Sequence, residues 1–299
     1  MKTRSLLGYT LSAACALALV LVIIGGIGSG VGAQRGNVDW AAVGLSTHHV
    51  AGTVHYLEGR GGNIGLSVGD DGVIMIDDQY APLTDRILDT IRQLSTAEIK
   101  WLINTHVHGD HTGGNENFGK MGVPILAQDR VRRRLAATQP EAALPVLTFS
   151  EDVTLYLNGE EVHIVPMPPG HTDGDSIIHF KGSDVIHTGD MFRTVAFPVI
   201  DRNSGGTLAG TIDALGIVAG MAGARTKIVP GHGVVSSRDD VIEFRDMVIT
   251  VADRVTELVG QGKSYDEVAA ADPTREFRAK WGDPERFLTA VYAELGGEG

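Results

Sequence analysis

Short runs of apolar residues alternate, from residue 50 onward, with longer runs in which apolar residues recur at helical spacing. Short or alternating apolar runs predict strands, and apolar positions three and four apart predict helices. The pattern predicts strands at residues 50–56, 64–68, 73–76, 99–104, 124–127, 153–157, 162–165, 176–180, 185–187 and 227–229. It predicts helices at residues 82–94, 129–137, 206–221, 239–259 and 284–295. This order is typical of an α/β or mixed (α+β) layered fold.

The N-terminal segment has a different pattern. Lys2 and Arg4 precede an apolar stretch at residues 11–24, which gives way to small residues that end at Ala33. This order is typical of a secretory signal peptide. We therefore expect cleavage of residues 1–33 after Ala33 and a periplasmic or secreted mature protein.

The competing interpretation of this segment is an uncleaved anchor, because the apolar run at residues 6–24 is about as long as a thin bilayer requires. If cleavage occurs, we expect no stable membrane association. Residues 34–46 are then expected to be a flexible leader. Residues 47–299 have the length of one domain, including the helices at the C-terminal end.

The charge of the chain restricts its partners. The formal net charge is −12, and residues 1–33 contain two basic residues and no acidic one, so the remaining chain carries −14. This balance argues against nucleic acid and against an anionic lipid surface, and it favours a small-molecule substrate. The single cysteine, Cys15, lies in the predicted signal peptide, so the mature chain has no thiolate for metal binding or nucleophilic attack.

The densest set of chemical groups follows the predicted strand at residues 99–104. It comprises His106, His108, Asp110 and His111 within six residues. Side chains two positions apart on an extended stretch point the same way, so His106 and His108 can share one ion. Asp110 and His111 follow a glycine that permits a tight turn, and they can face a second ion. Imidazole and carboxylate groups suit Zn²⁺, and by donor type also Fe or Mn.

Four further ligand-type residues stand just after predicted strands. His171, Asp190 and His232 each have a neighbouring glycine, and Asp77 follows the strand at residues 73–76. Loops at the edge of a rigid sheet are where functional groups collect. We therefore expect these side chains to meet the His106–His111 segment at one rim.

The pattern HxHxDH at residues 106–111, followed in order by His171, Asp190 and His232, resembles the metallo-β-lactamase-fold superfamily over about residues 50–235. The resemblance implies a four-layer αββα sandwich with a dinuclear site at one edge of its two sheets. It also implies two zinc ions, the first held by His106, His108 and His171, the second by Asp110, His111 and His232, with Asp190 bridging them.

The reaction that the resemblance implies is hydrolysis. Two divalent ions lower the pKa of a shared water and polarise the scissile carbonyl. Asp110 is the expected catalytic residue, which accepts or relays the proton. Asp77 is expected to hold a ligand imidazole or nearby backbone in place.

The substrate has to be inferred from context, because this fold serves many reactions. Asp190 stands where one class of β-lactamases has a cysteine, and in this the chain resembles glyoxalase II and quorum-signal lactonases. Expected export keeps β-lactams and lactones as candidates. The leading interpretation is an exported dinuclear zinc hydrolase that opens a small cyclic amide or ester, with β-lactams first. The alternatives are a thioester or lactone hydrolase of glyoxalase II or lactonase type, a di-iron redox protein on the same fold, and a noncatalytic binding protein.

Several other segments receive more ordinary interpretations. Asp78 is expected in a solvated turn, and Arg132–Arg134 on a solvated helix face. The loops at residues 59–65 and 195–206 are expected to cover the substrate.

Overall fold

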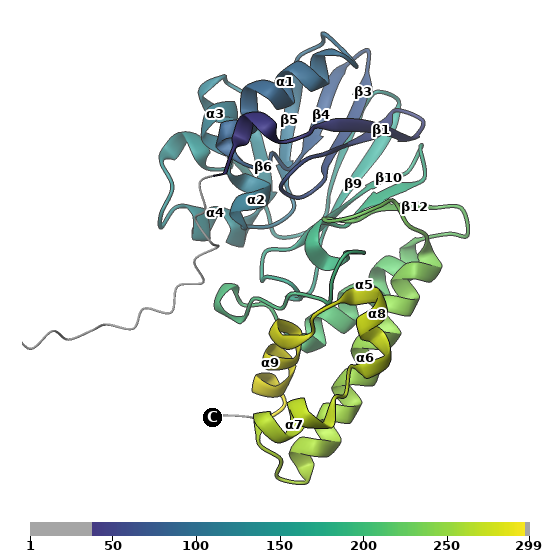
Figure 1. Cartoon of the computed structure of the whole chain (residues 1–299). Coiled ribbons are helices and arrows are strands. Elements are labelled where there is room, and N and C mark those ends of the chain that lie inside the picture. The colour runs from purple at the N-terminus through teal and green to yellow at the C-terminus, as the bar shows by residue number, and fades with distance from the viewer. Residues whose placement is uncertain (1–37, 297–299) are drawn as a thin grey trace, which may run out of the picture. The chain divides into compact units, whose positions relative to one another are not determined.

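Two β-sheets form the centre of the computed structural model, which describes residues 38–296 (Figure 1). The first sheet has the order β1 (Ser46–Ala51), β2 (Val54–Glu58), β3 (Ile64–Gly69), β4 (Gly72–Ile76), β5 (Ile99–Asn104), β6 (Ile125–Gln128) and β7 (Leu147–Phe149). The second has the order β12 (Lys227–Val229), β11 (Val185–His187), β10 (Ser176–Phe180), β9 (Glu160–Pro166) and β8 (Val153–Leu157).

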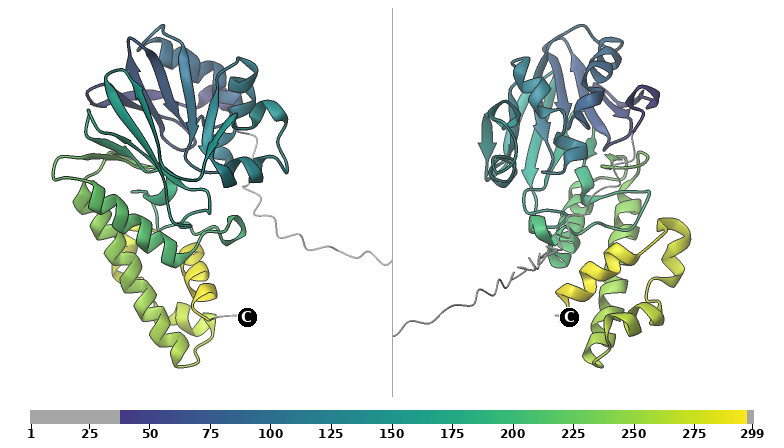
Figure 2. Two further views of the ribbon diagram at one scale, coloured as in Figure 1. Left: turned by 180° about the vertical axis from the view of Figure 1, so that it is seen from behind. Right: turned by 60° about the vertical axis from the view of Figure 1, so that its left-hand side comes forward.

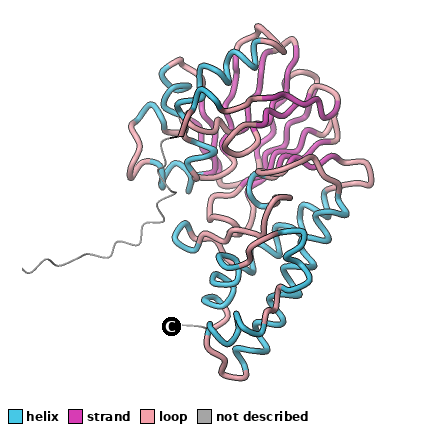
Figure 3. The backbone as a smooth tube through the Cα atoms, viewed as in Figure 1, coloured by secondary structure: helices cyan, strands magenta, loops and turns pink. Residues whose placement is uncertain are grey.

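The strand directions change within each sheet. Strands β1 to β4 pair antiparallel, whereas β4 to β7 pair parallel, as do β11 and β12. A hairpin with Asn158 and Gly159 at its turn joins β8 to β9, with Leu157 opposite Glu160. Both turn residues have a left-handed backbone, with φ of 57° and 70°, as a two-residue hairpin of this kind requires. The strands stand out from the surrounding helices in Figure 3.

The inner faces of the two sheets share one apolar core. Alternate residues of β4 and β5, such as Ile74, Ile76 and Ile103, pack with Ile164 and Ile178 of the second sheet, and all five are buried. The alternation with period two found in the sequence is thus the alternation between the inner and outer faces of each sheet.

Helices cover both outer faces (Figure 2). The first sheet packs against α1 (Thr84–Arg92) and α3 (Asn115–Lys120). The second packs against α5 (Leu208–Met221) and α6 (Arg238–Gly260), and the same apolar cluster extends into α7 (Tyr265–Ala271), α8 (Arg278–Trp281) and α9 (Glu285–Glu294). Helix α7 contacts α6 and α9. Shorter helices are α2 (Gly109–Thr112) and α4 (Asp129–Leu135). The predicted αββα sandwich is confirmed.

One predicted strand differs from the observed ones, and several short elements were not predicted. The strand expected at residues 50–56 is interrupted at Gly52, whose φ is 51°, and its two parts belong to β1 and β2. Helices α7 and α8 were not predicted, because they are short and each buries a single residue, Val268 and Trp281 respectively.

The expected leader at residues 34–46 needs correction where the structure describes it. Residues 40–42 form a 3₁₀ helix, and Trp40, Val43 and Leu45 pack against the core beneath α1. The Arg86 guanidinium donates hydrogen bonds to the carbonyls of Trp40 and Val43, at 2.7 and 2.6 Å. The compact unit therefore begins at Asp39, not at residue 47.

The predicted signal peptide, residues 1–33, lies outside the described residues. Between residues 38 and 296, no helix has both the length and the apolar character needed to cross a bilayer.

We predict that Arg86→Ala lowers the free energy of unfolding by roughly 1 to 3 kcal/mol, because it removes two charge-assisted hydrogen bonds to backbone carbonyls. Arg92→Ala is the matched control, since Arg92 lies on the same helix but forms an exposed ion pair with Asp89. Arg92→Ala should lower the free energy of unfolding by at most about 1 kcal/mol. Urea denaturation measures both, and equal losses would contradict the assignment.

Candidate metal centre

The ligand-type residues predicted from the sequence lie together at one end of the sandwich. Asp77 directly follows β4, and His106 follows β5. His171, Asp190 and His232 follow β9, β11 and β12 in the second sheet. The two facing sheets thus deliver side chains from both sides to a common rim, as the sequence predicted.

The first group consists of His106, His108 and His171, whose ligand atoms all lie within 4.8 Å of one another. Nδ1 of His108 is 2.8 Å from Nε2 of His171. The fold therefore brings two ring nitrogens face to face from residues that are 63 positions apart in the chain.

The second group consists of Asp110, His111 and His232, again with ligand atoms within 4.8 Å. Asp190 lies between the groups. Its Oδ1 is 3.3 Å from Nε2 of both His111 and His232, and its Oδ2 is 3.7 Å from Nε2 of His171. The two oxygens of one carboxylate thus face different histidine groups.

Asp77 holds one histidine of each group through hydrogen bonds. It is fully buried and accepts from the backbone N–H of Thr105 at 2.7 Å, from the Thr105 hydroxyl at 2.7 Å and from Nδ1 of His111 at 2.8 Å. Since the Thr105 hydroxyl donates to Asp77, its oxygen accepts from Nδ1 of His106 at 2.9 Å. Asp77 therefore orients His111 directly and His106 through Thr105.

The other two histidines of the first group, His108 and His171, are held by the loop before α5. Nε2 of His108 donates to Asp201 at 2.8 Å, and Nδ1 of His171 donates to the carbonyl of Val199 at 2.6 Å. Asp201 also accepts from backbone N–H groups within its own loop, including that of Ser204. This loop, expected to cover the substrate, therefore also supports the site.

In each of these four histidines the outward-facing ring nitrogen carries the proton of the hydrogen bond. In the neutral ring, the other nitrogen, which faces the centre of the cluster, is then a lone-pair acceptor. Nε2 of His106, Nε2 of His111 and Oδ1 of Asp190 are buried and have no hydrogen-bond partner among the described residues. Buried acceptors that face one another are destabilising unless a proton or a metal ion lies between them. The donor set, imidazole nitrogens and carboxylate oxygens, is one that divalent transition metals bind. The residues present fit a metal ion in each group.

Burial controls the ionisation of the first group. It lowers the pKa of His106 well below its ordinary value, with help from the neighbouring imidazoles. It also lowers the pKa of His171 to about 4, against the opposing effect of Asp190. Both rings are therefore neutral near pH 7, which is the state that binds a metal.

The second group is ionised. Burial opposes the charge of Asp110, but the hydrogen bond with His232 and the charge of His111 lower its pKa to about 2. The pKa of Asp190 is lowered well below its usual value, because His111 and His232 outweigh burial. The same contacts overcome burial and raise the pKa values of His111 and His232. Metal binding in this group therefore displaces protons.

Two glycines permit the close approach of backbone to the cluster. A Cβ at Gly62 would lie 2.0 Å from Cε1 of His111, and one at Gly231 would lie 2.0 Å from Oδ1 of Asp190. Only glycine fits at either position without displacing a cluster side chain.

Asn63 joins the two sheets at the site. Its backbone N–H donates to the carbonyl of Gly231 at 2.7 Å, and its side-chain amide donates to the carbonyls of Pro230 and Gly233, both at 2.9 Å. The loop at residues 59–65, expected to cover the substrate, thus fixes the turn that carries His232.

Several residues of the site were not predicted from the sequence, and two further residues have surroundings other than those expected. Thr105, Asp201 and Asn63 were not singled out, and only the position of Thr105 beside the histidine motif offered a signal. Asp78 is fully buried and accepts from the backbone N–H of Gly114 at 2.8 Å, so the expectation of a solvated turn residue is wrong. Arg134 forms two hydrogen bonds with Asp173 rather than standing free.

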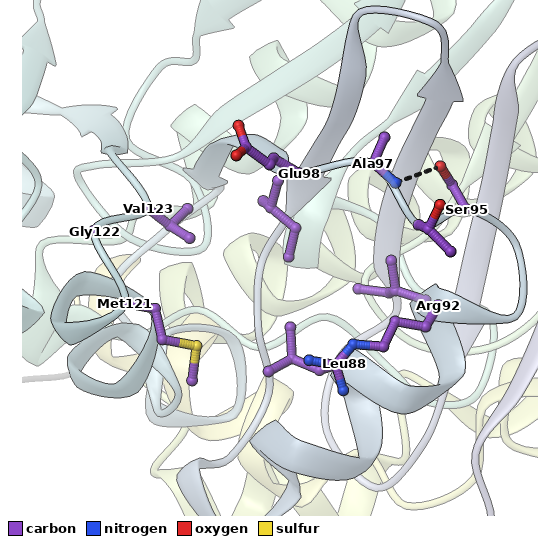
Figure 4. Close-up of a pocket in the computed structure, with 11 residues that line it drawn as sticks. Leu88, Arg92, Ser95, Ala97, Glu98, Met121, Gly122 and Val123 are labelled. Atoms are coloured by element: carbon purple, nitrogen blue, oxygen red, sulfur yellow. Dashed lines mark hydrogen bonds between the residues drawn. The ribbon is translucent and has the colours of Figure 1, made fainter.

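A different cavity, of about 430 Å³, lies at the opposite end of the first sheet, near the start of β5 (Figure 4). Its lining includes Leu88 and Met121, and its charged residues Arg92 and Glu98 are paired with Asp89 and Lys100. No histidine lines it. The candidate metal ligands therefore lie at the other end of the sandwich, at the rim formed by the ends of β4, β5, β11 and β12.

Comparison with known proteins identifies the family. Residues 57–232 match the family model described as the metallo-beta-lactamase superfamily. Among curated proteins, 137 residues are 27% identical to the 2,4-dinitroanisole O-demethylase subunit alpha of Nocardioides sp. (strain JS1661). That match covers 42% of this chain and 42% of the relative, so it spans less than half of either protein.

Solved structures share the fold at low sequence identity. A metallo-beta-lactamase from Pontibacter korlensis is 17% identical with a TM-score of 0.60, over 69% of this chain and 99% of that chain. The inverting sec-alkylsulfatase Pisa1 from Pseudomonas sp. is 18% identical with a TM-score of 0.68, over 85% of this chain and 51% of that chain. These likenesses concern the fold alone.

We predict that Asp77→Asn weakens zinc binding about 10- to 100-fold, because an amide cannot replace the carboxylate that orients His111 and Thr105. Asp78→Asn is the matched control. Asp78 is equally buried, burial raises its pKa well above the usual value, and its side chain accepts from the backbone of Gly114 rather than from a histidine ring. Its one bond to the cluster, from its backbone N–H to the carbonyl of His111 at 2.9 Å, is retained in the variant. Competition with a chromogenic chelator measures both affinities. An unchanged affinity in Asp77→Asn would refute the role given to Asp77.

Proposed function

The chain belongs to the metallo-beta-lactamase superfamily, and we propose that it is a dinuclear zinc hydrolase. The position of Asp190 is the observation that carries the proposal. One of its carboxylate oxygens faces His171, and the other faces His111 and His232. The first zinc would be held by His106, His108 and His171, the second by Asp110, His111 and His232, with Asp190 shared between them.

Divalent ions bound in these two groups supply Lewis acidity and a water of lowered pKa. The side of the cluster that solvent reaches is formed by Asp110, His108 and His232, whose side chains are 27%, 24% and 19% exposed. His111 is fully buried, and the side chain of Asp190 is 6% exposed. Substrate therefore enters over Asp110, His108 and His232.

Asp110 is the proposed proton-handling residue. Its Oδ2 lies 3.3 Å from Nε2 of His232, and its pKa of about 2 keeps it ionised near pH 7. A group with so low a pKa is a weak base. Its proposed role is to orient the attacking water and pass the proton on, rather than to retain it.

The proposed substrate is a small cyclic amide or ester, with β-lactams first and lactones or thioesters next. The formal charge of −14 on residues 34–299 supports a small molecule over a polyanion. The 27% identity to a 2,4-dinitroanisole O-demethylase subunit favours a second candidate, the removal of an alkyl group from an aryl ether. The donor set also suits iron, which measurement of the bound metal would reveal.

We predict zinc-dependent hydrolysis of a chromogenic cephalosporin by residues 34–299, with none in a metal-stripped sample. A γ-lactone, a thioester and 2,4-dinitroanisole are assayed in parallel, with metal content measured by mass spectrometry. Turnover of a different member of this panel would change the proposed substrate and leave the proposed metal-dependent mechanism in place. Two bound zinc ions without turnover of any member would refute the hydrolase proposal.

Two variants should test the assigned roles, His106 as a ligand of the first metal and Asp110 as both a ligand of the second metal and the proton-handling residue. His106→Ala is expected to abolish turnover through loss of bound metal, whereas Asp110→Asn should lower kcat about 10²- to 10⁴-fold. His163→Ala is the control, because His163 pairs with Asp152 and lies outside both groups. Full metal-dependent turnover in either of the first two variants would show that the assigned role is wrong.

We also propose that the protein is exported, on the basis of residues 1–33 alone. N-terminal sequencing of the mature protein should then begin at Gln34. A sequence that begins at Met1 would contradict cleavage and favour the anchored form.

A further inference from the structure

An ion pair on α4 contacts the loops that hold the first group of histidines. Nε and Nη2 of Arg134 donate to the two carboxylate oxygens of Asp173 at 2.7 and 2.8 Å, and the two side chains are 31% and 22% exposed. A two-pronged contact between a guanidinium and a carboxylate is more directional and stronger than a single surface ion pair. It therefore fixes the Asp173 turn, residues 171–175, against the helix.

Helix α4 is itself anchored in the first sheet. Its residues Val131 and Leu135 are buried in an apolar cluster with the end of β6. A Cβ at Gly174 would lie 2.9 Å from the Val131 side chain, so the Asp173 turn packs directly on α4. Nη1 of Arg130 also donates to the carbonyl of Asp173 at 3.0 Å. Because the Asp173 turn lies between β9 and β10 of the second sheet, these contacts join the two sheets beside the metal centre.

The Asp173 turn is in turn bonded to the loop before α5. The backbone N–H of Asp173 donates to the carbonyl of Ser204 at 2.9 Å. Nη1 of Arg134 donates to the carbonyl of Asn203 at 3.3 Å. Within that loop, Oδ1 of Asp201 accepts from the N–H groups of Asn203 and Ser204, at 3.1 and 3.2 Å. The place of the Asp201 carboxylate is therefore set from α4.

The loop before α5 ends this chain of contacts at two histidines of the first group. Oδ2 of Asp201 accepts from Nε2 of His108, and the carbonyl of Val199 accepts from Nδ1 of His171. The backbone N–H of Asp201 also donates to the carbonyl of His171 at 2.9 Å. A continuous path of hydrogen bonds thus runs from Arg134 to the outward-facing nitrogen of His108 and to the backbone of His171.

The second group has separate supports. His111 is held by Asp77, and the turn that carries His232 is held by Asn63. Neither support involves α4 or the loop before α5. Loss of the ion pair on α4 should therefore disturb the first group and leave the hydrogen bonds of the second in place.

We propose that Arg134, paired with Asp173, is a positioning residue for the first metal group, and that it holds the loop before α5 where this loop orients His108 and His171. This role rests on the proposed function, because it concerns a metal ion bound by these two histidines. The orientation of the His108 ring, however, can be measured in the metal-free chain.

The first test is zinc titration of the full chain in competition with a chromogenic chelator. Arg134→Ala should weaken one of the two zinc sites about tenfold and leave the other unchanged. The charge alone predicts the opposite sign, because loss of a positive charge near a cation site strengthens cation binding. Arg134→Lys, which keeps the charge but not the two-pronged contact, should also weaken that one site.

Arg133→Ala is the matched control. It removes the same charge from the same helix, but the Arg133 side chain is 74% exposed and lies 3.8 Å from its partner Asp129. Neither zinc site should be weakened in this variant. Weakening of both sites by Arg134→Ala, or equal weakening by Arg133→Ala, would overturn the proposal.

The second test uses the metal-free chain with ¹⁵N-labelled histidine, because the ring ¹⁵N shifts show which nitrogen carries the proton. We expect Nε2 of His108 to carry it in the unmodified chain and in Arg133→Ala. In Arg134→Ala and Arg134→Lys the proton should be shared between the two ring nitrogens, while the His111 ring held by Asp77 is unchanged.

An unchanged His108 ring in both Arg134 variants would overturn the proposal, whatever the zinc affinities. If Arg134→Ala does not fold, Arg134→Lys provides the same comparison. Failure of the unmodified chain to bind zinc would refute the proposed function instead, and the His108 ring would still decide whether Arg134 positions it.

Discussion

The candidate metal centre depends on the hydrogen bonds that the buried carboxylate of Asp77 accepts from Thr105 and His111. Asp77 is fully buried, and a charge removed from water is tolerated only when it is paired and hydrogen-bonded. Its bonds to Thr105 and His111 meet that requirement and fix one histidine of each metal group. The backbone of Asp77 has a φ of 60°, a conformation that costs a non-glycine residue about 1 to 3 kcal/mol. The surrounding hydrogen bonds hold this strained turn in place.

The strands and the candidate ligands could be predicted because both are marked by local patterns in the sequence. The period of two between apolar residues marks the faces of the sheets, and His106, Asp190 and His232 follow the ends of strands. The metal-ligand chemistry of a dense histidine motif is likewise a local feature. Local signals therefore predicted the strands and the candidate ligand residues, and the resemblance of the histidine motif to a known family implied the sandwich and a shared site for all seven proposed ligands.

The supporting residues could not be predicted in this way, because their contacts join distant parts of the chain. Asp201 bonds to a histidine 93 positions away, and Asn63 bonds to a carbonyl 167 positions away. Nothing in the sequence next to either residue reveals such a partner. The packing of Trp40 against the core was missed for the same reason, because the Arg86 guanidinium that bonds to its carbonyl is 46 positions away in the chain. Short helices such as α8 also lack a long periodic pattern.

We have proposed that two metal ions lie on either side of Asp190, each held by its own histidine group. Anomalous diffraction at the zinc edge, from crystals of the zinc-loaded protein, would locate both ions. We expect two peaks, one among His106, His108 and His171, the other among Asp110, His111 and His232. A single peak, or peaks away from Asp190, would contradict it.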